Sequence, residues 1–383
     1  MVKPGYKQTE VGVIPEDWEC TLLLDRASLL NGLTYTPDNV KDNGLLVLRS
    51  SNIRNNQLSL EDTVYVDCTV EDEKKIKTAD ILVCVRNGSA ALIGKCAQAN
   101  QDYDATIGAF MAVLRGEHND YINQILQQGT IQKEISKNSG AAINQITNGD
   151  FKRIRIALPT SGAEEFAIAQ SLSTVDKLFS TYEKLIAKKR AIKQGAVQEL
   201  LTGKKRLPGF SGEWQTILLK KALTIGHGMS QHEVECSTGK YPILATGGTI
   251  GRASRFLWNE PSVLIGRKGT INKPQYMDEP FWSIDTLFYT KINEGYCPKF
   301  LYYVFCRIDW LSYNEASGVP SLSAKTIEGI EVQVPDYVEQ CAIAETLSAM
   351  DTEIEALELK LEKYRQLKQG MMQQLLTGKI RLV

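Results

Sequence analysis

The sequence predicts an α+β chain in two similar halves, each a β-rich block followed by one long helix. Three observations carry this prediction. A stretch of about forty residues occurs twice at constant spacing, and a heptad stripe of apolar residues runs through both copies. The intervening blocks alternate short apolar runs with Gly, Asn and Ser turns. The chain is therefore expected to be a tandem duplication.

The repeat is clearest in one phrase. LLTGKKRLPGF at Leu200–Phe210 returns as LLTGKIRLV at Leu375–Val383, an offset of 175 residues (375 − 200). At the same offset AIAQSLSTVD (Ala167–Asp176) meets AIAETLSAMD (Ala342–Asp351). This many matches in one order exceed a sorting tag and argue against chance similarity.

The repeated segments predict two helices of about 35 residues, hence ~50 Å long. A single apolar stripe of that length needs a partner, and the other copy supplies one as a coiled coil. An antiparallel pair would hold the two β-rich blocks at opposite ends of a rod, at a spacing suited to two half-sites on DNA; a parallel pair is the alternative. Gly203 and Gly378, in the TGK phrases, are expected to cap the helices in the left-handed conformation. The stripe contains Ile168, Leu172, Val175, Phe179, Tyr182, Leu185 and Ile192 in the first copy, and Ile343, Leu347, Met350, Ile354, Leu357, Leu361, Tyr364, Met371 and Leu375 in the second.

The β-rich blocks carry polar loops directly after apolar strands, as in VLRSSNIRNNQ, VRNGSAALIGK, LATGGTIGRASR and IGRKGTINK. Such loops suit DNA, because Arg can bond guanine twice, Asn can bond adenine, and Gly lets the backbone approach phosphate. Solvated hairpin turns are the plainer interpretation of any one loop. The recurrence of Arg86/Gly88 and Arg267/Gly269 favours a DNA role for that pair of loops.

Composition bounds the function classes. The net charge of −1 means that DNA binding must depend on local basic patches. The polar N-terminus is no signal peptide, and no apolar run approaches the roughly 20 residues of a membrane span, so a cytoplasmic protein is expected. The eight cysteines include no CxxC pair, and several lie in strand-like runs, so free thiols are expected.

Catalytic motifs are missing from the sequence. It contains no P-loop and no GxGxxG, and NKPQY (Asn272–Tyr276) lacks the adjacent prolines of an aminomethyltransferase motif. His227, His232 and Cys236 could suggest a metal, but without a convincing fourth ligand a loop is the better interpretation. We expect no catalytic residue, no metal and no cofactor in this chain.

The segment YKQTEVGVIPEDWE (Tyr6–Glu19), the paired LLTGK phrases and the variable–helical–variable–helical order resemble the specificity subunit of type I restriction–modification systems. The resemblance covers essentially the whole chain. It implies two mixed α/β target-recognition domains in inverted orientation, separated by an antiparallel coiled coil of the two long repeated helices. The implied boundaries are an N-terminal arm at 1–17 that completes the second repeat, target-recognition domains at 18–158 and 208–335, a central helix at 159–207 and a C-terminal helix at 336–383.

The resemblance also implies the function and the partners. Each target-recognition domain would read one half of an asymmetric bipartite site in double-stranded DNA. Two methyltransferase subunits would dock on the helices and modify adenine N6, and motor-nuclease subunits would complete the restriction enzyme. S-adenosylmethionine, ATP and Mg are expected only in those partners, and no membrane association is expected.

Two sets of residues are predicted to act. The candidate DNA contacts are Arg49, Ser51, Asn52, Arg86 and Asn87 in the first domain and Thr246, Arg252, Arg267, Lys268 and Thr270 in the second. The candidate coiled-coil residues are Leu172, Val175, Phe179, Tyr182, Leu347, Met350, Ile354, Leu357 and Leu361. The basic run Lys188, Lys189, Arg190 and Lys193 is either a contact to spacer phosphates or, preferably, a solvated coiled-coil face. A coiled-coil adaptor with two protein-binding heads is the alternative function, and a self-contained restriction or modification enzyme is a weaker rival.

Overall fold

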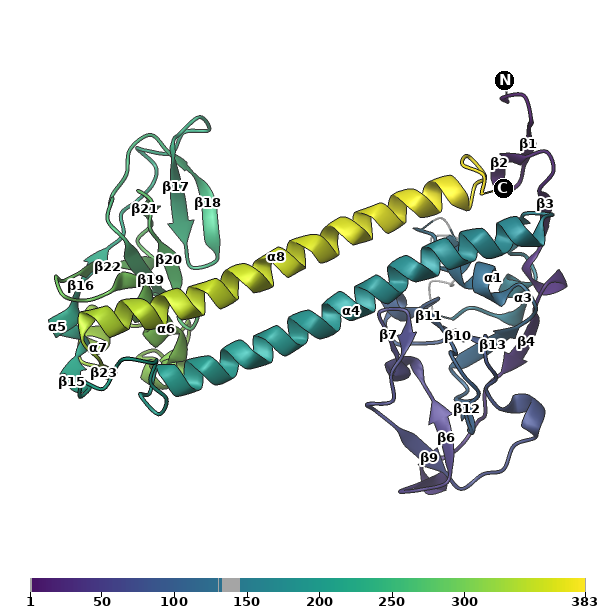
Figure 1. The fold of residues 1–383 in the computed structure, drawn as a ribbon, viewed down its shortest axis with the longest axis horizontal. Coiled ribbons are helices and arrows are strands. Elements are labelled where there is room, and N and C mark those ends of the chain that lie inside the picture. The colour runs from purple at the N-terminus through teal and green to yellow at the C-terminus, as the bar shows by residue number, and fades with distance from the viewer. Residues whose placement is uncertain (1, 130, 133–144, 383) are drawn as a thin grey trace. The chain divides into compact units, whose positions relative to one another are not determined.

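The computed structural model describes residues 2–129, 131–132 and 145–382, which divide into two compact units (Figure 1). Unit 1 comprises Met1–Tyr182 and Lys360–Val383, and unit 2 comprises Glu183–Leu359. Each unit combines a β-rich block with a segment of each long helix, so the chain has the predicted α+β class.

Unit 1 contains two four-stranded sheets. The first has the order β11-β10-β13-β4 and is antiparallel throughout, and the second has the order β12-β6-β9-β5, with β12 parallel to β6. Smaller pairs are β1-β2, β14-β3 and the hairpin β7-β8. The strands are β1 (Tyr6–Thr9), β2 (Gly12–Pro15), β3 (Glu19–Leu22), β4 (Ser28–Asn31), β5 (Val40–Lys41), β6 (Leu45–Leu48), β7 (Ile53–Arg54), β8 (Gln57–Leu58), β9 (Val64–Val66), β10 (Ile81–Cys84), β11 (Cys96–Gln98), β12 (Ala105–Ile107), β13 (Met111–Arg115) and β14 (Arg155–Leu158); short helices are η1 (Leu23–Asp25), η2 (Pro37–Asn39), η3 (Ser50–Asn52), η4 (Asp72–Lys74), η5 (Ala90–Leu92), α1 (Asn119–Leu126) and α3 (Asn148–Phe151).

Unit 2 is built on the same plan. One sheet has the order β16-β22-β19-β20, the second has the order β18-β17-β21, and β15 pairs with β23. The strands are β15 (Gln215–Leu218), β16 (Leu223–His227), β17 (Tyr241–Ala245), β18 (Gly248–Ala253), β19 (Ser262–Gly266), β20 (Gln275–Met277), β21 (Trp282–Ser283), β22 (Leu287–Ile292) and β23 (Glu331–Val334); helices are α5 (Leu219–Ala222), α6 (Pro298–Arg307), η6 (Trp310–Tyr313) and α7 (Ala324–Glu328).

One inner strand of each main sheet, β10 in unit 1 and β19 in unit 2, is buried on both faces. In β10, Ile81 and Val83 join a core with Trp18 and Tyr121, while Leu82 and Cys84 point into a second core. Successive side chains of a strand alternate between faces, so a strand between two cores reads as a continuous apolar run. In unit 2, Val263 and Ile265 of β19 lie in one core and Leu264 in another.

Two helices of 39 residues, α4 (Gly162–Leu200) and α8 (Tyr337–Leu375), pass from one unit into the other. In unit 1, Asp176 of α4 pairs with Lys368 of α8, and the rings of Tyr182 and Tyr364 lie 5.4 Å apart. The α4 numbers rise as the α8 numbers fall, so the two segments are antiparallel.

In unit 2 the two helices pair in the same way. Lys193 pairs with Asp351, and Arg190 lies 2.5 Å from Glu358, again with opposite numbering. The antiparallel pairing is therefore confirmed within each unit.

All nine candidate coiled-coil residues are buried or half-buried. The stripe of α4 departs from the heptad beyond Tyr182, because Leu185 and Ile192 are 36% and 49% exposed whereas Ile186 is buried. A strict seven-residue repeat drifts by about 20° per heptad on a straight helix, which moves the buried position by one residue. The expectation for Leu185 and Ile192 was wrong.

The predicted glycine caps are confirmed. Gly203 and Gly378 have φ of 66° and 65° and follow the last turns of α4 and α8. In each cap an amide two residues later bonds back into the helix, Lys205 N to Glu199 O at 3.3 Å and Ile380 N to Gln374 O at 3.2 Å. This pattern closes the helix with a left-handed residue, where glycine has no Cβ penalty.

The chain beyond each cap is held by one arginine. Arg381 contacts Glu164 through Nε at 2.6 Å and Nη2 at 2.8 Å, and also pairs with Asp17 of the N-terminal arm. Its repeat counterpart Arg206 bonds Glu339 through Nε at 2.5 Å and Nη2 at 2.6 Å. The arm also contacts the end of α8 directly, since the hydroxyl of Tyr6 donates to Gly378 O at 3.0 Å.

All eight cysteines are free, as expected. Within the described parts of the chain, no helix combines the length and the apolar character that crossing a bilayer requires.

Candidate nucleic-acid interface

Two loops meet at the ends of β6 and β10 in unit 1. Nδ2 of Asn87 donates to Oγ of Ser50 at 3.2 Å, which ties the loop after β10 to the loop after β6. Burial raises the pKa of the Cys84 thiol beneath them, so it stays protonated and donates to the backbone oxygen of Arg86 at 3.6 Å. The structure therefore brings predicted residues from sequence-distant loops into one cluster.

Arg49 and Ser51 lie at the first of these loops. Ser51 is exposed, and Arg49 is half-buried with its Nη2 2.9 Å from Oδ1 of Asp62. The carboxylate neutralises much of the arginine charge.

The candidate contact Asn52 is corrected by the structure. Its side chain is fully buried, accepts a bond from Arg49 N at 2.8 Å and donates to Ser59 O at 3.0 Å and Asp62 O at 2.7 Å. With its amide group committed inside the protein, Asn52 shapes the loop and presents no polar atom to a base. Position after an apolar strand could not distinguish an inward from an outward amide.

Arg86 is exposed, and its guanidinium carbon lies 5.2 Å from the centre of the Phe110 ring. Phe110 itself is 55% exposed, although it is a large apolar residue. Phe110 is not among the residues predicted from the sequence; an aromatic residue just before an apolar strand is the only signal that points to it.

In unit 2 the predicted residues are more dispersed. Thr246 is half-buried after β17, and exposed Arg252 on β18 donates from Nη1 to Lys240 O at 3.1 Å. Arg267 and Lys268 are exposed, and Thr270 is half-buried. The loop that contains Arg267, Lys268 and Thr270 is held by a backbone hydrogen bond, in which Gly269 N donates to Pro320 O at 2.9 Å.

The hydrogen bonds of the two units reveal which loop residues correspond. Arg86 N lies 3.2 Å from Phe110 O, and Lys268 N lies 3.3 Å from Thr286 O, while the preceding amides bond the same two carbonyls. Arg86 forms a bridge with Gln145, and Lys268 forms one with Ser321. The structural counterpart of Arg86 is therefore Lys268.

The recurrence of Arg-x-Gly in the two loops was misleading. Arg267 corresponds to Val85, because Arg267 N bonds Thr286 O as Val85 N bonds Phe110 O. The shift of one residue means that Arg267, whose Nη1 donates to Asp285 O at 3.4 Å, is not the structural counterpart of Arg86. Sequence similarity alone had placed the two arginines together.

The basic run of α4 lies mainly on the helix pair. Lys189 is 2.6 Å from Glu353, and Arg190 and Lys193 pair with Glu358 and Asp351. These contacts favour the coiled-coil face over a phosphate contact.

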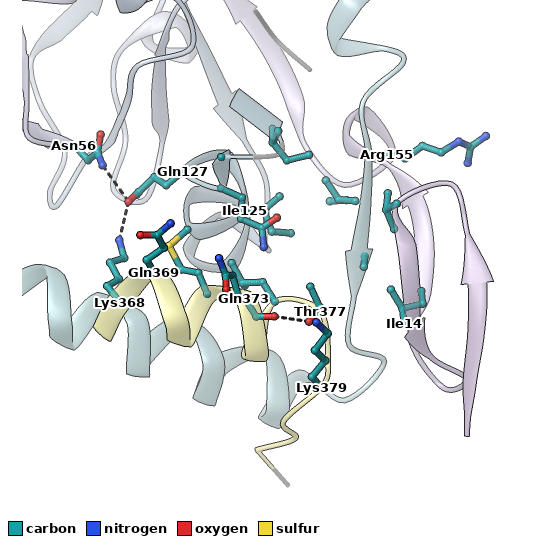
Figure 2. Close-up of a pocket in the computed structure, with 18 of the residues that line it drawn as sticks. Ile14, Asn56, Ile125, Gln127, Arg155, Lys368, Gln369, Gln373, Thr377 and Lys379 are labelled. Atoms are coloured by element: carbon teal, nitrogen blue, oxygen red, sulfur yellow. Dashed lines mark hydrogen bonds between the residues drawn. The ribbon is translucent and has the colours of Figure 1, made fainter. Parts of the chain in front are cut away.

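Unit 1 also has a groove of about 1030 Å³ between the N-terminal arm, α1, β14 and the helix segments (Figure 2). Its lining is rich in amides. Figure 2 shows Gln127 bridging the side chains of Asn56 and Lys368, with its Oε1 3.2 Å from Nδ2 and 2.8 Å from Nζ. Asp176 pairs with Lys368 there, so the two charges at the centre of the groove neutralise each other. No predicted DNA contact lines it. Among residues 2–129, 131–132 and 145–382, no group of three His, Cys, Asp or Glu side chains could hold a metal ion.

Comparison with known proteins assigns the fold. The family model of the type I restriction modification DNA specificity domain matches residues 15–194 and 212–363. The specificity subunit of the EcoKI type I restriction enzyme of Escherichia coli K12 is 31% identical over 212 residues, which is 51% of this chain and 46% of that subunit. The chain thus matches less than half of the length of that relative.

A relative of similar length also matches. A protein of Methanocaldococcus jannaschii assigned as the MjaX type I specificity subunit is 27% identical over 99% of this chain and 97% of its own length. The crystal structure of the S subunit from M. genitalium has a TM-score of 0.70 at 16% identity, covering 97% of this chain and 98% of that one, which shows a shared fold. Because the family model matches both halves, the chain belongs to the type I restriction–modification DNA specificity family.

Proposed function

We propose that this chain is the non-catalytic subunit that gives a type I restriction–modification complex its DNA sequence specificity. In this proposal each unit reads one half of an asymmetric, two-part site, and partner subunits methylate adenine N6 or cleave the DNA. The observation that carries the proposal is the match of a DNA specificity family to both halves of the chain. The polar loop cluster after β6 and β10, and the corresponding loop after β19, support it.

The proposed DNA contacts are the exposed or partly exposed loop residues. Basic and hydroxyl side chains at strand ends can bond both base edges and phosphates. These residues are Arg49, Ser51, Arg86 and Asn87 in unit 1 and Thr246, Arg252, Arg267, Lys268 and Thr270 in unit 2. Asn52 is proposed to act only by positioning the loop.

Two copies of a methyltransferase subunit are the proposed direct partners, and motor-nuclease subunits would join them. Ile192 and Leu367 occupy the same place in the repeat (192 + 175) and are 49% and 52% exposed. Exposed apolar residues at matching positions favour two docking sites of one kind. S-adenosylmethionine, ATP and Mg are assigned to these partners.

The docking proposal is tested by the mass of the complex. We expect Ile192→Glu and Leu367→Glu each to lose one methyltransferase copy, and the double variant to lose both, in native mass spectrometry. Complexes that keep both copies in the double variant would contradict these docking positions.

The function is tested by mapping N6-methyladenine across the genome of the source strain, with and without this gene. Methylation should disappear from one split, asymmetric motif when the gene is deleted. An unchanged map would refute the proposal. Affinity for DNA should also fall steeply with salt, as counterions return to the phosphates, whereas a protein-binding adaptor would show no such dependence.

A further inference from the structure

The arginines in and beside the loop cluster of unit 1 differ in whether a carboxylate neutralises them. Arg49 faces Asp62 at 2.9 Å, and Arg54 of the neighbouring hairpin pairs with Glu61. Arg86 has no carboxylate partner among the residues that the structure describes. Its guanidinium is instead held over the ring of Phe110. Within the described part of the chain, no carboxylate neutralises Arg86, and its planar fork can bond a ligand.

Phe110 gives Arg86 a defined direction. An arginine stacked on an aromatic face loses little further conformational freedom when it bonds a planar partner. The ring is exposed, so both the ring and the guanidinium can approach a duplex. Two neighbouring contacts, Asn87 to Ser50 and the backbone bond from Arg86 N to Phe110 O, hold the loop beneath.

We infer that Arg86 is the base-reading side chain of unit 1 and that it recognises guanine, while its counterpart in unit 2 is Lys268 and not Arg267. Guanine is the base whose major-groove edge offers two acceptors, N7 and O6, at the spacing of the arginine fork. The inference rests on the proposed function and adds to it which residue reads a base and which base it reads.

The correspondence with Lys268 has support outside the loops themselves. A Cβ on Gly32 would lie 2.0 Å from Gly108 O, and a Cβ on Gly228 would lie 1.8 Å from Ile284 O. The same close approach therefore occurs in both units, at Gly108 and Ile284, two residues before Phe110 and Thr286. This fixes the register of the two loops.

Unit 2 has a weaker version of the cluster. By the same register, Thr286 replaces Phe110, and Gly269, with φ of 88°, replaces Asn87. Lys268 thus has no aromatic platform at that position and carries a point charge rather than a fork. Unit 2 should discriminate less strictly at this position than unit 1.

The test uses single substitutions of the gene in the source strain, followed by mapping of N6-methyladenine. Arg86→Gln should relax one guanine position in one half of the split motif by roughly ten- to a hundred-fold, with the other half unchanged. Arg86→Lys keeps the charge but loses the fork, and it should relax the same position. Lys268→Gln should alter the other half of the motif. Arg267→Gln, which removes a proposed contact to the DNA backbone, should lower methylation evenly at all sites and leave the base preference of both halves unchanged.

Several outcomes would overturn the inference. If Arg86→Gln lowers methylation uniformly at all sites, or if Arg86→Lys restores the wild-type motif, Arg86 is a phosphate contact. If Arg267→Gln relaxes the second half while Lys268→Gln does not, the register argument fails. Loss of the proposed function itself is distinguishable, because then deletion of the whole gene leaves the methylation map unchanged.

Discussion

Lys368 is the most deeply buried cation of the paired helices. Its side chain is 7% exposed, and Nζ lies 2.6 Å from Asp176 Oδ1 and 2.8 Å from Gln127 Oε1. Asp176→Asn keeps the shape of the side chain and removes its charge. The ammonium group would then be buried with only neutral partners, which costs ~3 kcal/mol of the free energy of unfolding. Removing one partner of a buried ion pair costs about 3–5 kcal/mol, and the lower end of that range applies because Asp176 is 25% exposed.

The repeat supplies a matched control. Lys193 and Asp351 are the counterparts of Lys368 and Asp176, but their side chains are 27% and 31% exposed. Water can solvate the charge that Asp351→Asn leaves behind, so that variant should lose only ~1 kcal/mol. The same chemical change in two copies of one sequence thus separates the effect of burial from the effect of the pair.

Urea denaturation of the full-length variants measures both losses, with the midpoint of each resolved transition as the observable. A double variant, Asp176→Asn with Lys368→Met, should recover most of the loss, because no buried charge remains. Equal losses for Asp176→Asn and Asp351→Asn, or no recovery in the double variant, would refute the reasoning that burial sets the cost.

Three further predictions follow from the caps, the loop and the N-terminal arm. Gly203→Ala should destabilise the protein by ~1 kcal/mol through its left-handed φ. Gly378→Ala should cost more when the two variants are compared by thermal unfolding, since its Cβ would also lie 2.3 Å from Cγ of Pro15. Asn52→Ala should cost about 2–3 kcal/mol by leaving buried polar groups unpaired, whereas exposed Ser51→Ala should change stability by less than ~0.5 kcal/mol. The hydrogen bond from Arg381 lowers the pKa of Asp17 below its usual value. The contribution of Asp17 to stability is therefore present at neutral pH and is lost as the pH falls below about 4, the range in which free aspartate protonates. Asp17→Asn should reduce that acid-dependent loss of stability in denaturation curves recorded across pH.

The repeat and the helices could be predicted from the sequence because their signals are periodic. Heptad spacing and the TGK phrases locate Leu172, Leu347, Gly203 and Gly378 without any knowledge of the fold. In the β-rich blocks only the strands themselves could be predicted, because the pairing of one strand with another depends on residues far apart in the sequence. The pairing of β12 with β6 as a parallel strand had no local signal.

The candidate site was predictable at the level of loops and failed at the level of side chains. Position after a strand found both Arg86 and Asn52, yet one is exposed and the other has no exposed surface. The difference is set by η3, which turns Asn52 inward to bond Arg49 N and two carbonyls. A sequence motif likewise paired Arg86 with Arg267, and only the backbone hydrogen bonds showed the shift of one residue.

The burial of β10 and β19 on both faces has a consequence for how such a protein can acquire new targets. A substitution at any position of either strand disturbs one of the two cores, at a cost of about 2–5 kcal/mol for a large residue cut to alanine. A substitution at the residue that leaves the strand, such as Arg86 or Lys268, costs about 0.5 kcal/mol or less. Substitutions therefore cost little stability only where the chain leaves the sheet. A new base preference can arise at such a residue while the sheet that carries it stays stable.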